Sequence, residues 1–226
     1  GAATDYLEQS LVSSRIIGDK RGIYSALINL GTAAYYQEDY ALARNYFEQV
    51  LDAYLTGGIR EQEAVCLYKL GQVTMAQGDL LRTRDYFEQS LVFSRSTTTG
   101  TLLPETLSNL AIIYLLLHQE ALASATLRES VEAAGNFAVS HVQFWPLVAA
   151  TRMWIIKGKP LQAATWLGLV ENHAHPAIKM ADIQRVIQAA RAECVAALSP
   201  EQFAAAWEEG KNLDVDTVIA DILREL

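Results

Sequence analysis

Histidine and cysteine, the side chains best suited to catalysis or metal binding, are few and widely spaced in this chain. The 226 residues include four histidines and two cysteines. His173 and His175 are two residues apart, which places them on different sides of a helix, so they predict no zinc site by themselves. Cys66 and Cys194 fit neither a metal-binding spacing nor a disulfide framework, and we expect two reduced core thiols.

Carboxylates recur at a fixed interval instead of forming a catalytic pair. Glu8, Glu48 and Glu88 are spaced by 40 residues, which indicates a structural repeat and not an acid–base site. The sequence contains no glycine-rich dinucleotide loop, phosphate loop, nucleophile elbow or zinc-protease motif. We therefore expect a protein that is not an enzyme and that uses no cofactor and no metal.

Charge and hydropathy narrow the range of partners. The net charge is −8 and the isoelectric point is about 5.0, so neither nucleic acid nor an anionic membrane surface is expected to bind directly. The densest apolar run, residues 110–117, is far shorter than the roughly 18 residues that cross a bilayer. The N-terminal residues do not show the pattern of a signal peptide, and we expect none. These features predict a cytoplasmic location.

The elements that must position any site are set by an internal repeat. YLEQSL begins at Tyr6, YFEQVL at Tyr46 and YFEQSL at Tyr86, with a spacing of 40 residues both times. Apolar residues at helical spacing over 24–37 and 40–55 predict two helices per repeat. Asp39 and Asp79 follow the polar breaks between the helices, and we expect them to be N-caps of the second helices.

These patterns predict an all-α fold with two regions. Residues 1–175 form the repeat array and residues 176–226 form capping helices, with a strong helix start at Ser199-Pro200. The array begins with the second helix of a truncated repeat and continues with four helix pairs. Their expected bounds are 4–17, 24–55, 64–95, 104–135 and 144–172.

The repeat resembles the tetratricopeptide repeat (TPR) in three positions. Leu-Gly stands in the first helix at residues 30–31 and 70–71, and a small residue follows at Ala43 and Thr83. An aromatic residue comes four positions later, at residues 47 and 87. The resemblance covers residues 4–172 and implies a right-handed α-solenoid, although the period is 40 residues instead of the usual 34 or so.

A narrower resemblance concerns the loops and the tail. The connection 18–22, Gly-Asp-Lys-Arg-Gly, is similar to the long-period repeats of bacterial signal-transduction ATPases with numerous domains, the STAND class. Residues 163–168 and 203–211 are similar to the C-terminal end of such transcriptional regulators. The later loops, 56–59 and 96–100, depart from the pattern. The resemblance implies a sensor domain, with an ATPase switch domain elsewhere in the full-length protein.

The TPR resemblance also implies that the first helices line a concave binding face. Tyrosine, asparagine, lysine and arginine in such a groove suit a peptide or a small polar ligand, and Lys69 and Arg152 would favour an acidic group. For the equivalent residues Asn29 and Asn109, hydrogen bonds to the backbone of a neighbouring repeat are the alternative. The expected contact residues are Asn29, Tyr36, Tyr68, Lys69, Gln72, Asn109 and Arg152.

Two functions remain open at this point. The first is a sensor that binds a protein, a peptide or a small-molecule inducer and transmits the event to a switch domain. The second is a passive scaffold that assembles partner proteins. We also expect an exposed apolar surface at Tyr6, Leu7 and Leu11 on the truncated repeat, which would allow a homodimer.

Overall fold

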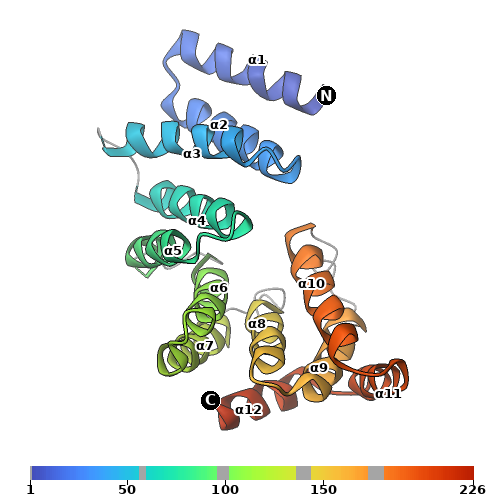
Figure 1. Ribbon diagram of the computed structural model, residues 1–226. Helices are drawn as coiled ribbons and strands as arrows, with labels where there is room; N and C mark the ends of the chain where they lie inside the picture. The colour runs from blue at the N-terminus through green and yellow to red at the C-terminus, as the bar shows by residue number, and fades with distance from the viewer. Residues whose placement is uncertain (1, 56–59, 96–101, 136–143, 173–180) are drawn as a thin grey trace. The chain divides into compact units, whose positions relative to one another are not determined.

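The computed structural model describes residues 2–55, 60–95, 102–135, 144–172 and 181–226, and within these ranges every regular element is an α-helix (Figure 1). The chain divides into two compact units, Gly1–Gly100 and Thr101–Leu226. Unit 1 contains α1 (Ala2–Ile17), α2 (Lys20–Tyr36), α3 (Tyr40–Leu55), α4 (Arg60–Ala76) and α5 (Leu80–Ser94). Unit 2 contains α6 (Leu102–Leu116), α7 (Glu120–Gly135), α8 (Phe144–Ile156), α9 (Pro160–Asn172), α10 (Ala181–Ala197), α11 (Pro200–Gly210) and α12 (Val215–Glu225).

Helices that are neighbours in sequence pack against each other within each unit. In unit 1, α1 packs on α2, α2 on α3, α3 on α4 and α4 on α5. In unit 2, α6 packs on α7 and α8 on α9, while α10 contacts both α8 and α9. This consecutive packing fits a helical repeat, and it confirms the all-α prediction for the described residues.

The turns inside the helix pairs share one backbone conformation. Glu38, Gly78, His118 and Gly158 stand forty residues apart and all have positive φ, between 59° and 78°. Glycine adopts this left-handed conformation freely, whereas Glu38 and His118 accept a strain of about 1–2 kcal/mol. Each of these residues therefore ends one helix and redirects the chain into the next.

The predicted N-caps of unit 1 are confirmed. Asp39 Oδ1 accepts a hydrogen bond from the Leu42 backbone N–H at 3.0 Å, and Asp79 Oδ1 accepts one from the Arg82 N–H at 3.1 Å. Each carboxylate satisfies a backbone N–H that the first turn of a helix leaves without a partner. The two caps fix where α3 and α5 begin.

Glycine and phenylalanine form the seam of each helix pair in unit 1. A Cβ atom on Gly31 would lie 2.6 Å from Phe47 Cε1, and one on Gly71 would overlap the Phe87 ring. Both phenylalanines are fully buried. The glycines of the repeated Leu-Gly pairs thus allow α2 and α4 to approach α3 and α5 closely.

The C-terminal helices pack by different contacts. The helix start predicted at Ser199-Pro200 is confirmed and is a capping box, with Ser199 Oγ accepting from the Gln202 N–H at 3.2 Å. α11 crosses α9 where Gly168 and Gly210 meet, so closely that a Cβ on Gly210 would overlap the Thr165 carbonyl. α12 buries Val218 and Ile222. Its end is tied down by Lys159, whose Nζ lies 2.6 Å from Glu225 Oε2.

Candidate binding face

One side of α2 carries polar residues, among them Asn29 and Tyr36, which we expected to be contact residues. Ser25, Asn29, Thr32 and Tyr36 follow one another at intervals of four and three residues, so they share a helix face. Asn29 and Tyr36 are exposed, and the Thr32 hydroxyl donates to the Ile28 carbonyl at 2.8 Å. The equivalent residues of α4, forty positions on, are Val65, Lys69, Gln72 and Ala76. We call these eight residues the α2–α4 face, because α2 also contacts α4.

Three predicted contact residues of α4 come together in one hydrogen-bonded chain. Lys69 Nζ donates to Gln72 Oε1 at 3.0 Å, and Gln72 Nε2 donates to the Tyr68 hydroxyl at 3.0 Å. The Lys69 ammonium also lies 5.8 Å from the centroid of the Tyr68 ring. The chain holds the Lys69 side chain, which is half-buried, in one orientation at the surface.

Tyr68 and Gln72, which we expected to be exposed, are buried. Their exposed fractions are 2% and 6%. The Tyr68 ring stacks on Phe87 of α5 with centroids 5.4 Å apart. The boundary between the core and the surface of α4 therefore falls between Tyr68 and Lys69. On the α2–α4 face, the polar groups at the surface are the Ser25 hydroxyl, the Asn29 amide, the Tyr36 phenol and the Lys69 ammonium.

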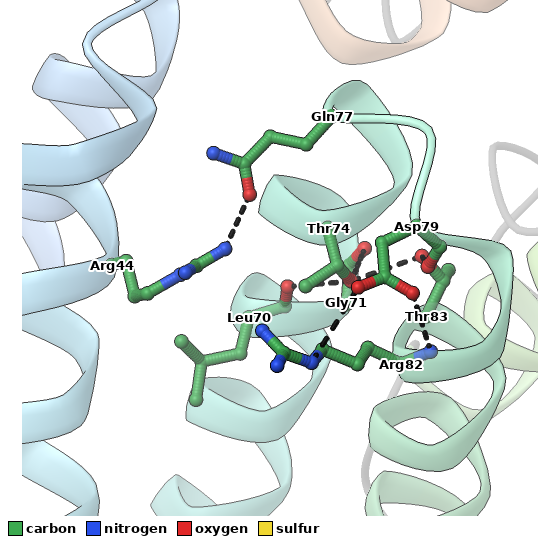
Figure 2. Close-up of polar contacts among 8 residues, drawn as sticks. All are labelled: Arg44, Leu70, Gly71, Thr74, Gln77, Asp79, Arg82 and Thr83. Carbon is green, nitrogen blue, oxygen red and sulfur yellow. Dashed lines mark hydrogen bonds and ion pairs between the residues drawn. The ribbon is translucent and has the colours of Figure 1, made fainter.

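The end of the α4–α5 pair is a separate polar cluster with a structural role (Figure 2). Thr74 and Thr83 hydroxyl oxygens lie 2.9 Å apart in the core, and Thr74 also bonds the Leu70 carbonyl. Arg44 of α3 reaches across and donates to Gln77 Oε1 at the end of α4. These contacts join the α2–α3 pair to the α4–α5 pair and fix the end of α4, which carries part of the α2–α4 face.

In unit 2 the equivalent asparagine is an internal residue. Asn109 is 5% exposed, and its Nδ2 donates to the Glu105 carbonyl of the same helix at 3.1 Å. This bond lies within α6. Ile112 and Leu115 are buried beside it, as expected for core residues.

Arg152 is engaged by a helix that the sequence did not lead us to consider as its partner. Its NH2 group lies 3.1 Å from Glu193 Oε1 on α10, and the two side chains are 21% and 35% exposed. Its Nε is buried, with no hydrogen-bond partner among the described residues. Because Glu193 already neutralises the guanidinium, an acidic ligand would have to compete with Glu193 for Arg152.

Unit 2 contains a second polar network, which we did not predict from the sequence. Glu171 of α9 accepts hydrogen bonds from Arg191 and, at 2.6 Å, from Trp207 Nε1. The Arg191 guanidinium lies 5.1 Å from the Phe203 ring and 5.6 Å from the Trp207 ring. The repeat interval was the available signal, because Trp207 stands 40 residues after Leu167 and Arg191 stands 40 after Thr151. The network binds α9, α10 and α11 together.

The cysteines are buried free thiols, as predicted. Burial raises the pKa of the Cys66 thiol to about 12, and the Glu63 charge adds to this effect. Burial likewise raises the pKa of Cys194 to about 11, with contributions from Glu193 and Glu171. Both thiols are protonated near neutral pH, so neither is an activated nucleophile.

The described ranges contain neither a metal-binding cluster nor a membrane-spanning helix. There, no group of three or more histidine, cysteine, aspartate or glutamate residues could hold a metal ion. His118 is exposed in its turn, and the other three histidines (141, 173 and 175) lie outside the described residues. None of the helices in the described ranges has the length and apolar character needed to cross a membrane.

No model of a known protein family matches this chain, and no curated protein matches it.

Proposed function

We propose that this chain is a non-catalytic binding domain that recognises its partner on the first helices of a helical repeat. The α2–α4 face supports the proposal most directly. Asn29, Tyr36 and Lys69 offer an amide, a phenol and a cation on two adjacent helices. Such groups on a rigid surface suit a peptide or protein segment that carries an acidic side chain.

The rigidity of this face comes from the core beneath it. Gly31 and Gly71 bring α2 and α4 against Phe47 and Phe87, and the Gln72 bridge orients Lys69. A preorganised surface loses less conformational entropy on binding than a flexible one does. The face therefore has the properties of a recognition surface that exists before its ligand arrives.

The finer form of the proposal rests on the sequence resemblances. The helix pairs form a right-handed TPR-like solenoid with a period of 40 residues, and the domain is the cytoplasmic sensor of a bacterial STAND-class signalling ATPase. Its partner is a protein, a peptide or a small-molecule inducer. Binding is transmitted to an ATPase switch domain through a change in helix packing, which requires an interface with two stable arrangements.

The alternative is a passive scaffold that assembles proteins without switching. The network of Glu171, Arg191 and Trp207 favours it, because it fastens three helices of unit 2 to one another. A scaffold would keep the same helix packing with and without its partner. Hydrogen exchange measured on α10 in the two states separates a sensor, in which protection changes, from a scaffold, in which it does not.

The binding test uses the 226-residue chain and a library of labelled acidic and neutral peptides. We expect acidic peptides to bind, and Lys69→Glu to abolish that binding. Lys20→Glu is the matched control, because Lys20 is an exposed lysine of unit 1 on the other side of α2 from Asn29. Equal losses in both variants would mean that net charge alone attracts the peptides. Binding that survives Lys69→Glu would remove the α2–α4 face as the site.

A further inference from the structure

The outer seam of α1 differs from the same seam of the later second helices. Residues 6, 7 and 10 of α1 correspond, forty and eighty positions on, to residues of α3 and α5. At position 7 the later residues, Phe47 and Phe87, pack on the glycines of α2 and α4 and are fully buried. At position 10, Val50 and Ser90 are also fully buried. In α3 and α5, this seam therefore holds the first helix of the pair.

A serine at position 10 makes a specific contact in this seam. Ser90 Oγ donates to the Ala64 carbonyl of α4 at 2.8 Å, and Ser130 Oγ donates to the Pro104 carbonyl of α6 at 2.8 Å. Both serines are fully buried. The hydroxyl thus satisfies a backbone carbonyl near the start of the first helix, and burial of that carbonyl would be costly without it.

In α1 the same positions are open. Tyr6 is 72% exposed and Ser10 is exposed, while Ile17, at the end of the same side, is 76% exposed. Leu7 lies at the edge of this side and is half-buried, because it packs against the core cluster of Leu11, Tyr24 and Leu27. We call Tyr6, Leu7, Ser10 and Ile17 the α1 seam. Leu11 is 7% exposed, so it does not belong to the apolar surface that we expected from the sequence.

We propose that the α1 seam binds an amphipathic helix from outside residues 1–226, in the manner in which α5 holds α4 and α7 holds α6. The partner helix carries a small residue opposite Leu7 and an accessible backbone carbonyl opposite Ser10. In both α4 and α6 these two features are seven residues apart, at Ala64 and Gly71 and at Pro104 and Ala111. Seven residues are about two helical turns, so both features face the same way.

The size of the small residue follows from position 7. α1 has leucine there, as does α7 at Leu127, and the first helix of that pair carries Ala111 instead of glycine. Because leucine is shorter than the phenylalanines of α3 and α5, alanine fills the space that the ring would occupy. The best partner therefore has alanine at this point.

A second copy of the chain is a poorer occupant of the α1 seam. Among the described first helices, the small residues Gly31 and Gly71 already face their own phenylalanines. A second copy could place one of these glycines against the α1 seam only by unfolding the helix pair to which that glycine belongs. The occupant is therefore a separate helix, and the proposal concerns a different surface from the α2–α4 face.

The test uses a fluorescent peptide that copies residues 60–79 with Cys66→Ser and Gly71→Ala, titrated with the 226-residue chain. We expect saturable binding in fluorescence anisotropy. Ser10→Arg should weaken it by about tenfold or more, because the arginine would bury a charge against the peptide. Gln9→Arg is the control, since Gln9 and its equivalents Gln49 and Gln89 are exposed. A peptide with tryptophan in place of the alanine should not bind.

Both serine and glutamine variants should fold normally, because the two side chains are exposed, and matching thermal midpoints check this. The proposal is overturned if the peptide shows no saturable binding, or if Ser10→Arg and Gln9→Arg weaken binding equally. Sedimentation of the chain alone provides a further check. A concentration-dependent dimer that Ser10→Arg abolishes would assign the α1 seam to a second copy and overturn the separate helix.

Discussion

The first helices of the two units use equivalent positions for different purposes. In unit 1, Asn29 of α2 is exposed and Lys69 of α4 is half-buried with its ammonium at the surface. In unit 2, Asn109 is buried within α6 and Arg152 is paired with Glu193 of α10. The position of Asn29, Lys69 and Asn109 is thus a surface group in unit 1 and an internal one in unit 2, while Arg152, at the position of Gln72, is tied to α10.

For Arg152, the cause of the difference is an additional layer in unit 2, whereas α6, which carries Asn109, packs on α7 and α8. α10 contacts both α8 and α9, and α11 packs closely on α9 at Gly168 and Gly210. Polar residues beneath this layer need partners inside the protein, because a buried charge without one is costly. A repeat position therefore predicts which way a side chain points along its helix, but the next packed layer decides whether it meets solvent.

The largest expected effect tests the glycine crossing that holds this layer. In Gly210→Ala the new Cβ overlaps the Thr165 carbonyl, and a backbone atom cannot move aside as a side chain can. We expect a loss of about 2–3 kcal/mol in the free energy of unfolding, measured by urea denaturation. Gly135→Ala is the control, since a Cβ there meets nothing within 4 Å. Equal stability of the two variants would contradict the close crossing.

The corresponding prediction for unit 1 concerns the seam beneath the α2–α4 face. Gly71→Ala should cost about 1–3 kcal/mol, because the new Cβ overlaps the Phe87 ring. Adding Phe87→Leu reproduces the Ala111 and Leu127 combination of unit 2, so part of the loss should be recovered. A double-mutant cycle in urea measures this coupling. Additive losses would mean that glycine at this position does not serve the phenylalanine.

The features that could be predicted from sequence are those set by nearby residues. The Asp39 and Asp79 caps depend on one carboxylate and the first turn of one helix, and the glycine seams recur at a constant interval. The capping box at Ser199 is likewise local. Helical spacing and capping chemistry are sufficient to place such features.

The missed features depend on how separate helices fit together. Tyr68 and Lys69 are adjacent in sequence, yet stacking on Phe87 buries one and leaves the other at the surface. The Arg152–Glu193 pair joins residues 41 positions apart through the docking of α10, which no local pattern encodes. Helical spacing predicts roughly which way a side chain points. It does not predict on which side of the boundary between core and surface each of two adjacent residues lies.

A smaller effect is expected from the ion pair that distinguishes unit 2. Arg152→Met removes the ion-pair partner of Glu193 on α10. We expect the free energy of unfolding to fall by about 1 kcal/mol, a small loss because both side chains are partly exposed. Lys69→Met in unit 1 should change the stability by less than about 0.5 kcal/mol. Chemical denaturation measures both. If Lys69→Met costs as much as Arg152→Met, the two positions do not differ in role.

The smallest expected effect is the acid response of the end of α12. The pKa of Glu225 is lowered, chiefly by the hydrogen bond from Lys159 and then by that from Gln162. A lowered pKa in the folded state means that the contact stabilises above the ordinary glutamate value of about 4.3 and that this contribution is lost as the pH falls through the folded value. Because Glu225 is exposed, solvent screening limits the contribution to less than about 1 kcal/mol.

The measurement for this prediction is the thermal midpoint of the chain between about pH 3 and pH 7. Glu225→Gln should lower the midpoint at neutral pH, and the difference from the unmodified chain should shrink toward pH 3 as the native carboxyl becomes protonated. Lys159→Met should reproduce this pattern, because it removes the principal donor to the same carboxylate at 2.6 Å. A midpoint difference that stays constant over the range would mean that α12 is held by Val218 and Ile222 alone, and that the polar tie of unit 2 does not extend to its last helix.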